Sequence, residues 1–177
     1  MMNAPAQTPT IQQKLLVTRI IGFALINGVV LFLAVTFFMN KAAPIAPTGT
    51  VTLFTGIAAI LWVTMLFAGK LLYARQLSPS VLSPLIENRN EDDALHIVYP
   101  RLQVACIMRW ALLEGPAMFA CVTLFLYHAS LKTQPILWIN VAIVVLSVAM
   151  IALSIPSEAS LRELIRTTRL SGSRPHR

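Results

Sequence analysis

The chain has 177 residues, of which 56% are hydrophobic and only 12% are charged. A soluble domain of ordinary composition has about a quarter of its residues charged, so this composition excludes a typical soluble fold. The net charge of +7 is compatible with nucleic-acid binding, but most basic residues flank apolar runs or lie near the C-terminus, as they do beside membrane spans. We therefore predict an all-α integral membrane protein that binds the lipid bilayer and no nucleic acid.

Four apolar runs are long enough to cross a bilayer as helices. Residues 1–13 are polar and are expected to form a disordered cytoplasmic tail. Residues 74–100 form a long polar loop, in which we expect short surface-lying turns rather than another span. The predicted spans are 15–39, 51–73, 101–128 and 136–155, and together they make a four-helix transmembrane domain over residues 14–155.

Residues 156–177 are predicted to form a basic amphipathic helix and a flexible tail. In the segment SLRELIRTTRL the apolar residues share one helix face, while the basic residues fall largely on the others. Such a helix lies on anionic membranes, with its apolar stripe in the lipid and its cations at the headgroups. The predicted membrane-surface contacts are Arg162, Arg166 and Arg169.

The basic residues are distributed unequally between the two sides of the four spans. Lys41 and Lys132 fall on one side, and the other twelve Lys and Arg residues fall on the opposite side. Loops rich in Lys and Arg stay in the cytoplasm. The sequence therefore predicts a multi-pass protein of the inner (cytoplasmic) membrane, with both termini and the long loop in the cytoplasm.

The first and third spans are similar to each other. A shift of 87 residues aligns residues 14–39 with 101–126 and gives ten identities in 26 positions, where roughly three or four are expected between two apolar helices of this composition. This repeat predicts two tandem hairpins related by an axis along the membrane normal, with chance similarity as the alternative. It aligns Glu114 with Asn27, and it places Gly28 and Gly115 where the two helices are expected to approach closely.

Glu114 places a carboxyl group inside the third apolar run. An ionisable group at membrane depth costs at least ~2.5–3.5 kcal/mol, so it usually faces protein or water and has a partner. We expect Glu114 to face the bundle interior as a neutral acid, bonded to Asn27 or to the carbonyl of Leu112. That carbonyl has no N–H donor at Pro116, where we expect a kink.

Residues 111–122, ALLEGPAMFACV, resemble the carboxylate-bearing helix of the proteolipid (c-ring) subunit of rotary ATPases. That helix has a similar run of Ala-Leu, then Glu, a small residue, and a mixture of small, apolar and aromatic residues. The resemblance implies that Glu114 alternately binds and releases a proton or a monovalent cation. It is local, because the second span has only Gly56 and Gly69 where the family has a dense glycine repeat. Short four-span bacterial membrane proteins have this layout as well.

Two function classes follow from these patterns. In the first, the protein is proteolipid-like, and Glu114, Asn27 and Leu112 form a proton or cation site. In the second, it is a structural or accessory subunit of a homo-oligomer or larger membrane complex, and Glu114 is a buried, hydrogen-bonded acid. The sequence contains no nucleophile–base pair, metal-ligand spacing or cofactor motif, so we predict no enzyme activity, no metal and no cofactor.

Overall fold

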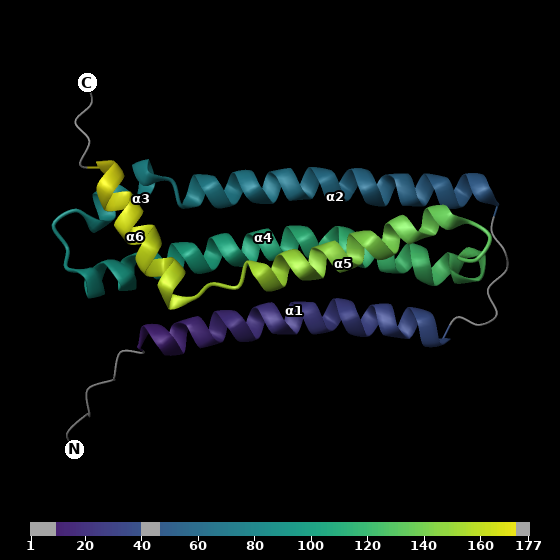
Figure 1. The fold of residues 1–177 in the computed structure, drawn as a ribbon, viewed down its shortest axis with the longest axis horizontal. Helices are drawn as coiled ribbons and strands as arrows, with labels where there is room; N and C mark the ends of the chain where they lie inside the picture. The colour runs from purple at the N-terminus through teal and green to yellow at the C-terminus, as the bar shows by residue number, and fades with distance from the viewer. Residues whose placement is uncertain (1–9, 40–46, 173–177) are drawn as a thin grey trace, which may run out of the picture.

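The computed structural model describes residues 10–39 and 47–172, and these residues contain helices and no strand. The elements are α1 (Ile11–Met39), α2 (Thr48–Gln76), α3 (Pro79–Ile86), α4 (Glu91–Tyr127), the short 3-10 helices η1 (His128–Ser130) and η2 (Pro135–Leu137), α5 (Trp138–Leu153) and α6 (Glu158–Gly172). The long helices α1, α2, α4 and α5 lie side by side, and α3 and α6 lie together at one end (Figure 1). Most of the predicted N-terminal tail and the end of the predicted C-terminal tail lie outside the described residues.

Four helices are long and apolar enough to cross a membrane, as the sequence predicts. The longest is α4, whose 37 residues extend for about 55 Å, well beyond a hydrocarbon core of about 30 Å. Its neighbour α5 has 16 residues and extends for only about 24 Å. Because a short connection joins the end of α4 to the start of α5, the N-terminal part of α4 projects beyond α5, and α3 and α6 pack there.

The third long helix starts at Glu91 rather than near Arg101, so the predicted long loop is shorter than expected. Asn90 caps this helix, because its Oδ1 accepts a hydrogen bond of 2.8 Å from the backbone N–H of Asp93. The first turn is acidic, which suits the positive end of the helix dipole. Where short surface-lying turns were expected, this loop contains the short helix α3, which buries Leu82 and Ile86.

The centre of the bundle is α4, which packs against α1, α2 and α5. Figure 1 shows α1 and α2 on opposite sides of the α4–α5 pair. Consecutive helices α4 and α5 form a packed hairpin, whereas α1 and α2 make little contact with each other. The predicted first hairpin is therefore wrong as a packed pair, because both of its helices turn their buried faces toward α4.

Polar side chains join α5 to α2 at intervals of seven residues. Asn140 Nδ2 donates a hydrogen bond of 2.8 Å to Thr55 Oγ1, and both side chains are buried. Trp62 Nε1 donates a hydrogen bond of 3.0 Å to Ser147 Oγ. The partners of each pair are 85 positions apart in the sequence, so the two helices run parallel and in register. A seven-residue interval keeps side chains on one helix face.

Trp110 lies where α1, α4 and α5 meet. Its side chain is fully buried, and its Nε1 donates a hydrogen bond of 2.8 Å to Ser154 Oγ at the end of α5. Its ring lies against Gly22 of α1, where an added Cβ would come within 3.2 Å of the ring. A buried tryptophan needs space for its ring and an acceptor for its N–H, and here a glycine and a serine provide them.

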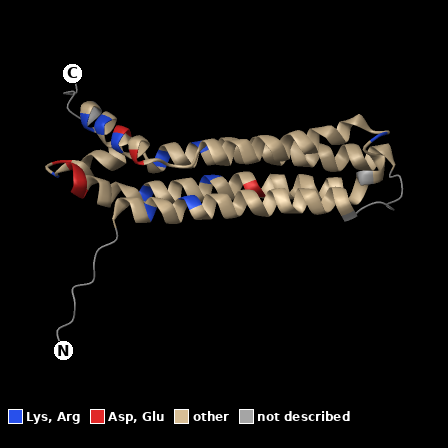
Figure 2. Ribbon diagram, turned by 60° about the horizontal axis from the view of Figure 1, so that its bottom comes forward, with Lys and Arg blue, Asp and Glu red and all other residues tan. Residues whose placement is uncertain are grey.

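Most Lys and Arg positions on the ribbon lie toward the end of the bundle that carries α3 and α6, which we call the basic end (Figure 2). Arg19 belongs to this end, and its Nε donates to the backbone carbonyl of Pro156 at 3.4 Å, which ties α1 to the segment between α5 and α6. Lys132 lies at the opposite end, in the turn between η1 and η2. The uneven charge distribution of the sequence is therefore a property of the folded bundle.

The Trp62–Ser147 hydrogen bond gives a test of how polar contacts stabilise the bundle. We expect Ser147→Ala to lower the free energy of unfolding by about 0.5–1.5 kcal/mol, because it leaves the indole N–H without an acceptor. Unfolding in bilayers or mixed micelles measures this loss. A double-mutant cycle with Trp62→Phe is expected to show that the two losses are not additive.

Thr64→Ala is the matched control. Thr64 is exposed on α2, the helix that carries Trp62, and it makes no side-chain hydrogen bond with a described residue. We choose Ser147 over Asn140 because the Oδ1 of Asn140 is buried without a hydrogen-bond partner among the described residues. A substitution of Asn140 would remove this unsatisfied oxygen, which stabilises the fold, and would also remove the hydrogen bond to Thr55, which destabilises it. Equal effects of Ser147→Ala and Thr64→Ala would contradict a stabilising role.

Candidate functional site

Glu114 lies in the part of α4 that packs within the bundle, and its side chain is half-buried. Its carboxyl group makes no hydrogen bond or ion pair with any described residue. Thirteen residues separate it from Tyr127, the last residue of α4, which corresponds to about 20 Å along the helix axis. The carboxyl group is therefore far from that end of a helix that is long and apolar enough to cross a membrane.

Asn27, the predicted partner of Glu114, is exposed on α1, and the two side chains form no hydrogen bond. The buried positions of α1 recur at intervals of three, four and seven residues. They are Leu15, Thr18, Gly22, Val29 and Thr36. This spacing keeps one face of α1 against the bundle and leaves Asn27 on the outer face. The prediction that Glu114 and Asn27 form a hydrogen bond within a single chain is therefore wrong.

The expectation that Gly28 and Gly115 bring α1 and α4 together is also wrong. Both glycines are exposed, and a Cβ added to either would meet no atom within 4 Å. The close approaches occur elsewhere, at Gly22 on α1 and at Gly69 on α2. A Cβ at Gly69 would lie 3.5 Å from the side chain of Arg109, so glycine lets α2 and α4 pack closely there.

Leu112 and Pro116 lie on the side of α4 that faces α2. Leu112 Cδ1 would be 3.7 Å from a Cβ added at Gly69, and α4 continues as one helix through the buried Pro116. A cavity of about 170 Å³ is lined here by Leu61, Met65, Ala111, Leu112, Gly115 and Pro116, and Glu114 does not line it. The lining side chains carry no oxygen ligand, so this cavity suits an apolar group better than a cation.

The geometry around Glu114 bears on which ion it can hold. A lone carboxyl group can take up a proton, whereas a metal cation needs several oxygen ligands around it. Among the described residues, no three His, Cys, Asp or Glu side chains form a group that could hold a metal ion. The described residues therefore supply no such metal-binding group around Glu114.

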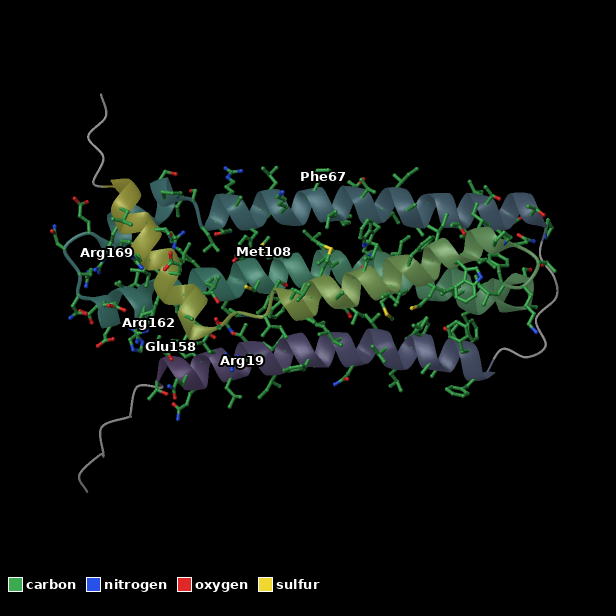
Figure 3. The ribbon with its side chains drawn as sticks, viewed as in Figure 1. Arg19, Phe67, Met108, Glu158, Arg162 and Arg169 are labelled. Atoms are coloured by element: carbon green, nitrogen blue, oxygen red, sulfur yellow. The ribbon has the colours of Figure 1, made fainter. Side chains whose placement is uncertain are left out.

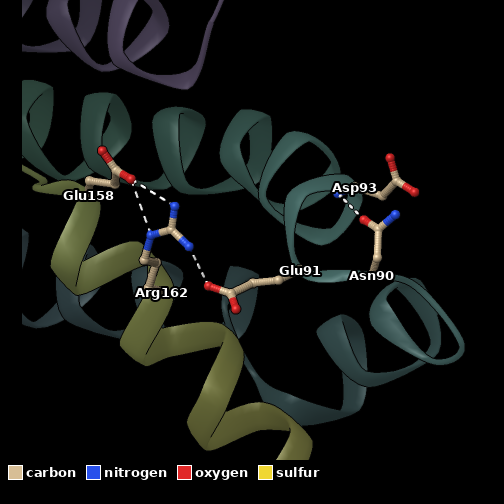
Figure 4. A network of polar contacts seen from close by, with 5 residues as sticks. All are labelled: Asn90, Glu91, Asp93, Glu158 and Arg162. Carbon is tan, nitrogen blue, oxygen red and sulfur yellow. Dashed lines mark hydrogen bonds and ion pairs between the residues drawn. The ribbon is translucent and has the colours of Figure 1, made fainter.

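Two of the three arginines that were predicted to contact the membrane bind the protein instead (Figures 3 and 4). Arg162 donates hydrogen bonds of 3.1 and 2.9 Å to Glu158 Oε1, and it also forms an ion pair with Glu91 at the start of α4. Arg169 donates a hydrogen bond of 2.9 Å to the backbone carbonyl of Arg89. These contacts tie α6 to the α3–α4 connection. Arg166 is 76% exposed and lies 3.9 Å from Glu163.

The apolar stripe of α6 packs on the protein. Leu161 and Ile165 are 0% and 2% exposed, and they join a buried cluster with Leu82 of α3 and Leu95 of α4. The prediction that this stripe enters lipid is therefore wrong. The physical reason is that the projecting part of α4 and the short helix α3 present an apolar surface that covers it.

Sequence reasoning missed the polar residues that join the helices. Asn140, Ser147 and Ser154 recur every seven residues along α5, and Thr55 and Trp62 have the same interval on α2. This interval, in runs that are otherwise apolar, is the signal that identifies a shared helix face. The positions contact neighbouring helices in the bundle and stabilise it, and Ser154 also lines a cavity at the basic end.

The ion pairs of α6 predict a dependence on pH and on salt. The hydrogen bonds from Arg162 hold the pKa of Glu158 below its usual value. A carboxyl group with a lowered pKa stabilises the folded state at higher pH, and this contribution is lost as the pH falls through the lowered pKa. We therefore expect the amides of α6 to be less protected from hydrogen exchange, relative to their intrinsic rate at the same pH, in acid below the usual carboxyl range and also at high salt. Hydrogen exchange of the full chain measures both effects.

Arg162→Gln should produce the same faster exchange in α6 at neutral pH, because it removes the contacts to Glu91 and Glu158. Arg166→Gln is the matched control, since Arg166 is on the same helix and is largely exposed. Equal exchange in the two variants would mean that the ion pairs do not hold α6 in place.

Glu114 remains the candidate site, because it is the charged side chain placed deepest in the apolar part of the described spans. Its half-buried carboxyl group is open to contact from outside the chain. No protein-family model matches this chain, and no curated protein and no solved structure matches it significantly.

Proposed function

We propose that this protein is a subunit of a membrane assembly, in which a transmembrane helix of a second copy or of another protein covers the face that bears Glu114. One observation supports this proposal: the carboxyl group lies at membrane depth without a partner among the described residues. An acid in this position is costly unless a polar group meets it. A neighbouring helix can donate or accept the missing hydrogen bond.

The outer face of α1 offers a surface of the required kind. Ala24, Asn27 and Gly28 are all exposed on it. Small residues four positions apart let two transmembrane helices approach closely, and an amide side chain forms hydrogen bonds across such contacts. In an assembly of identical copies, Asn27 of one copy can therefore serve as the partner of Glu114 in the next.

The membrane-spanning parts of α1 and α2 are mostly uncovered, which also supports an assembly. Only 17% of the most apolar window of each helix is buried. Large apolar side chains on α2, such as Phe67 at 66% exposure, point away from the bundle (Figure 3). Lipid can cover such residues, and so can the helices of other subunits.

Proton binding at Glu114 is the second candidate function. It is favoured by the resemblance of residues 111–122 to the carboxylate helix of proteolipid subunits and by the single carboxyl group of this region. In such a role, Glu114 is neutral while it holds the proton, and it becomes a carboxylate when it releases the proton to water or beside a cationic group. A monovalent cation would require further oxygen ligands from the neighbouring subunit.

Substitutions of Glu114 test the assembly. Glu114→Gln keeps the shape and the hydrogen-bonding groups, so we expect the assembly to persist. Glu114→Leu removes them, and we expect association in bilayers to weaken about tenfold, which corresponds to about 1.4 kcal/mol. Single-molecule photobleaching in lipid vesicles measures the number of associated subunits. Met108→Leu, at a 37% exposed position on the same helix, is the control and should not change this number.

The same variants separate the two candidate functions. A membrane-permeant carbodiimide should label a proton-binding Glu114 less at high pH, and Glu114→Gln should abolish both the labelling and any proton-dependent activity while the assembly persists. A wild-type protein that stays monomeric at all densities in bilayers would contradict the assembly proposal.

We further propose that the basic end lies in the cytoplasm, because the predicted spans leave twelve Lys and Arg residues on that side and only Lys41 and Lys132 on the other. In intact cells, an impermeant thiol reagent should label Lys132→Cys and should label Glu87→Cys only after permeabilisation. We prefer Glu87 to Asn88, since Asn88 has φ of 61°, which cysteine adopts less readily. The native cysteines Cys106 and Cys121 are buried. Labelling of Glu87→Cys in intact cells would reverse the orientation.

A further inference from the structure

A cavity of about 570 Å³ lies at the basic end, where α2, α4, α5 and α6 meet. Its walls include Tyr73 of α2, Arg109 of α4, Met150 and Leu153 of α5, and Leu164 of α6. This volume is in the usual range of ligand pockets, about 300–1,000 Å³. The combination of mostly apolar walls with a few polar groups is typical of a site for an amphiphilic molecule.

Arg109 forms no ion pair in this wall, although the carboxylate of Glu163 also lines the cavity. Its side chain is half-buried, and its guanidinium carbon lies 5.5 Å from the centroid of the Tyr73 ring. It forms no ion pair or hydrogen bond with a described residue, in contrast to Arg162. Stacking over an aromatic ring holds the guanidinium in place while its N–H groups stay available. Those donors match the oxygen atoms of a phosphate group.

The depth of Arg109 matches that of a phospholipid headgroup. Eighteen residues separate it from Tyr127 at the far end of α4, which corresponds to about 27 Å, close to the thickness of the hydrocarbon core. The membrane-spanning helix α5 ends at the same level, because Ser154 binds Trp110, the residue next to Arg109. The cavity therefore lies where acyl chains end and phosphate groups begin.

The remaining walls fit a lipid that enters from the bilayer. Leu153 lines the cavity and is 87% exposed, so the cavity is open to the surroundings of α5. From α6, Ser160 and Thr167 contribute hydroxyl groups, and Glu163 contributes a carboxylate that lies 3.9 Å from Arg166. An acyl chain can follow the apolar wall while the polar headgroup remains under α6.

We propose that this cavity binds one phospholipid of the adjoining leaflet, with its phosphodiester at Arg109 and the upper part of an acyl chain along Met150 and Leu153. Free phosphate has the same chemistry at Arg109, but it would leave the apolar walls uncovered. The bound lipid connects α6 to the membrane-spanning helices. This site is separate from Glu114, so it does not depend on the proposed assembly.

The test uses the purified full-length protein in detergent and native mass spectrometry. Three probes are added separately: phosphatidylglycerol, a diacylglycerol with the same acyl chains and no phosphate, and inorganic phosphate. We expect one phosphatidylglycerol to remain bound and diacylglycerol to bind at least tenfold more weakly. Millimolar inorganic phosphate should not displace the phospholipid, because it makes no apolar contact.

Variants of Arg109 identify the group that holds the phosphate. We expect Arg109→Gln to lower phospholipid retention at least fivefold and Arg109→Lys to lower it less, since lysine keeps the charge without the fork of donors. Arg101→Gln is the control, because Arg101 is exposed on the same helix and does not line the cavity. A thermal melt of each variant checks that it is folded.

Three results would overturn the proposal. They are equal binding of diacylglycerol and phosphatidylglycerol, displacement of the lipid by inorganic phosphate, and unchanged retention in a folded Arg109→Gln variant. The comparison of the two lipids needs no substitution, so the proposal remains testable if Arg109→Gln does not fold.

Discussion

The packing of Trp110 is the interaction on which the rest of the structure depends. Its ring fills the space that Gly22 leaves on α1, and its N–H bonds Ser154 at the end of α5. One side chain thus sets the positions of three membrane-spanning helices at the same depth. It also fixes the level of its neighbour Arg109, which lines the cavity of about 570 Å³ at the basic end. A larger residue at Gly22 would push α1 away and open this junction, because an added Cβ already lies at a tight 3.2 Å from the ring.

The two ends of the molecule are stabilised by different forces. At the basic end, α3, α6 and the projecting part of α4 bury an apolar cluster that includes Leu82, Leu95 and Leu161. This region extends beyond the hydrocarbon core, so apolar burial from water stabilises it in the ordinary way. Within the bilayer the surroundings are as apolar as the protein interior, and helices associate through close packing and polar contacts instead. The Asn140–Thr55 and Trp62–Ser147 bonds supply those contacts.

Glu114 and Arg109 are two charged side chains of α4 that form no ion pair with a described residue. They differ in the kind of partner that we propose for each. Glu114 is well within the core and beside exposed helix faces, so another helix is its natural partner. Arg109 is at the level of the headgroups and beside a cavity of about 570 Å³, so a phospholipid is its natural partner. The two proposed sites, one for another helix and one for a phospholipid, are about 7.5 Å apart along α4 by its helical rise.

The sequence by itself determined the number of apolar helices long enough to span a membrane and the grouping of basic residues, because length, hydropathy and charge act locally along the chain. It also identified Glu114 as a costly residue that needs an explanation. Only the tertiary structure decided which face of each helix is buried. The repeat aligned Asn27 with Glu114, yet the buried face of α1 follows Gly22 and Val29 and leaves Asn27 outside. The physical reason is that lipid and protein interior are equally apolar, so a membrane helix carries little amphipathic pattern to mark its buried face. On α6, by contrast, the amphipathic pattern was plain, but the sequence did not determine whether lipid or α3 would cover it.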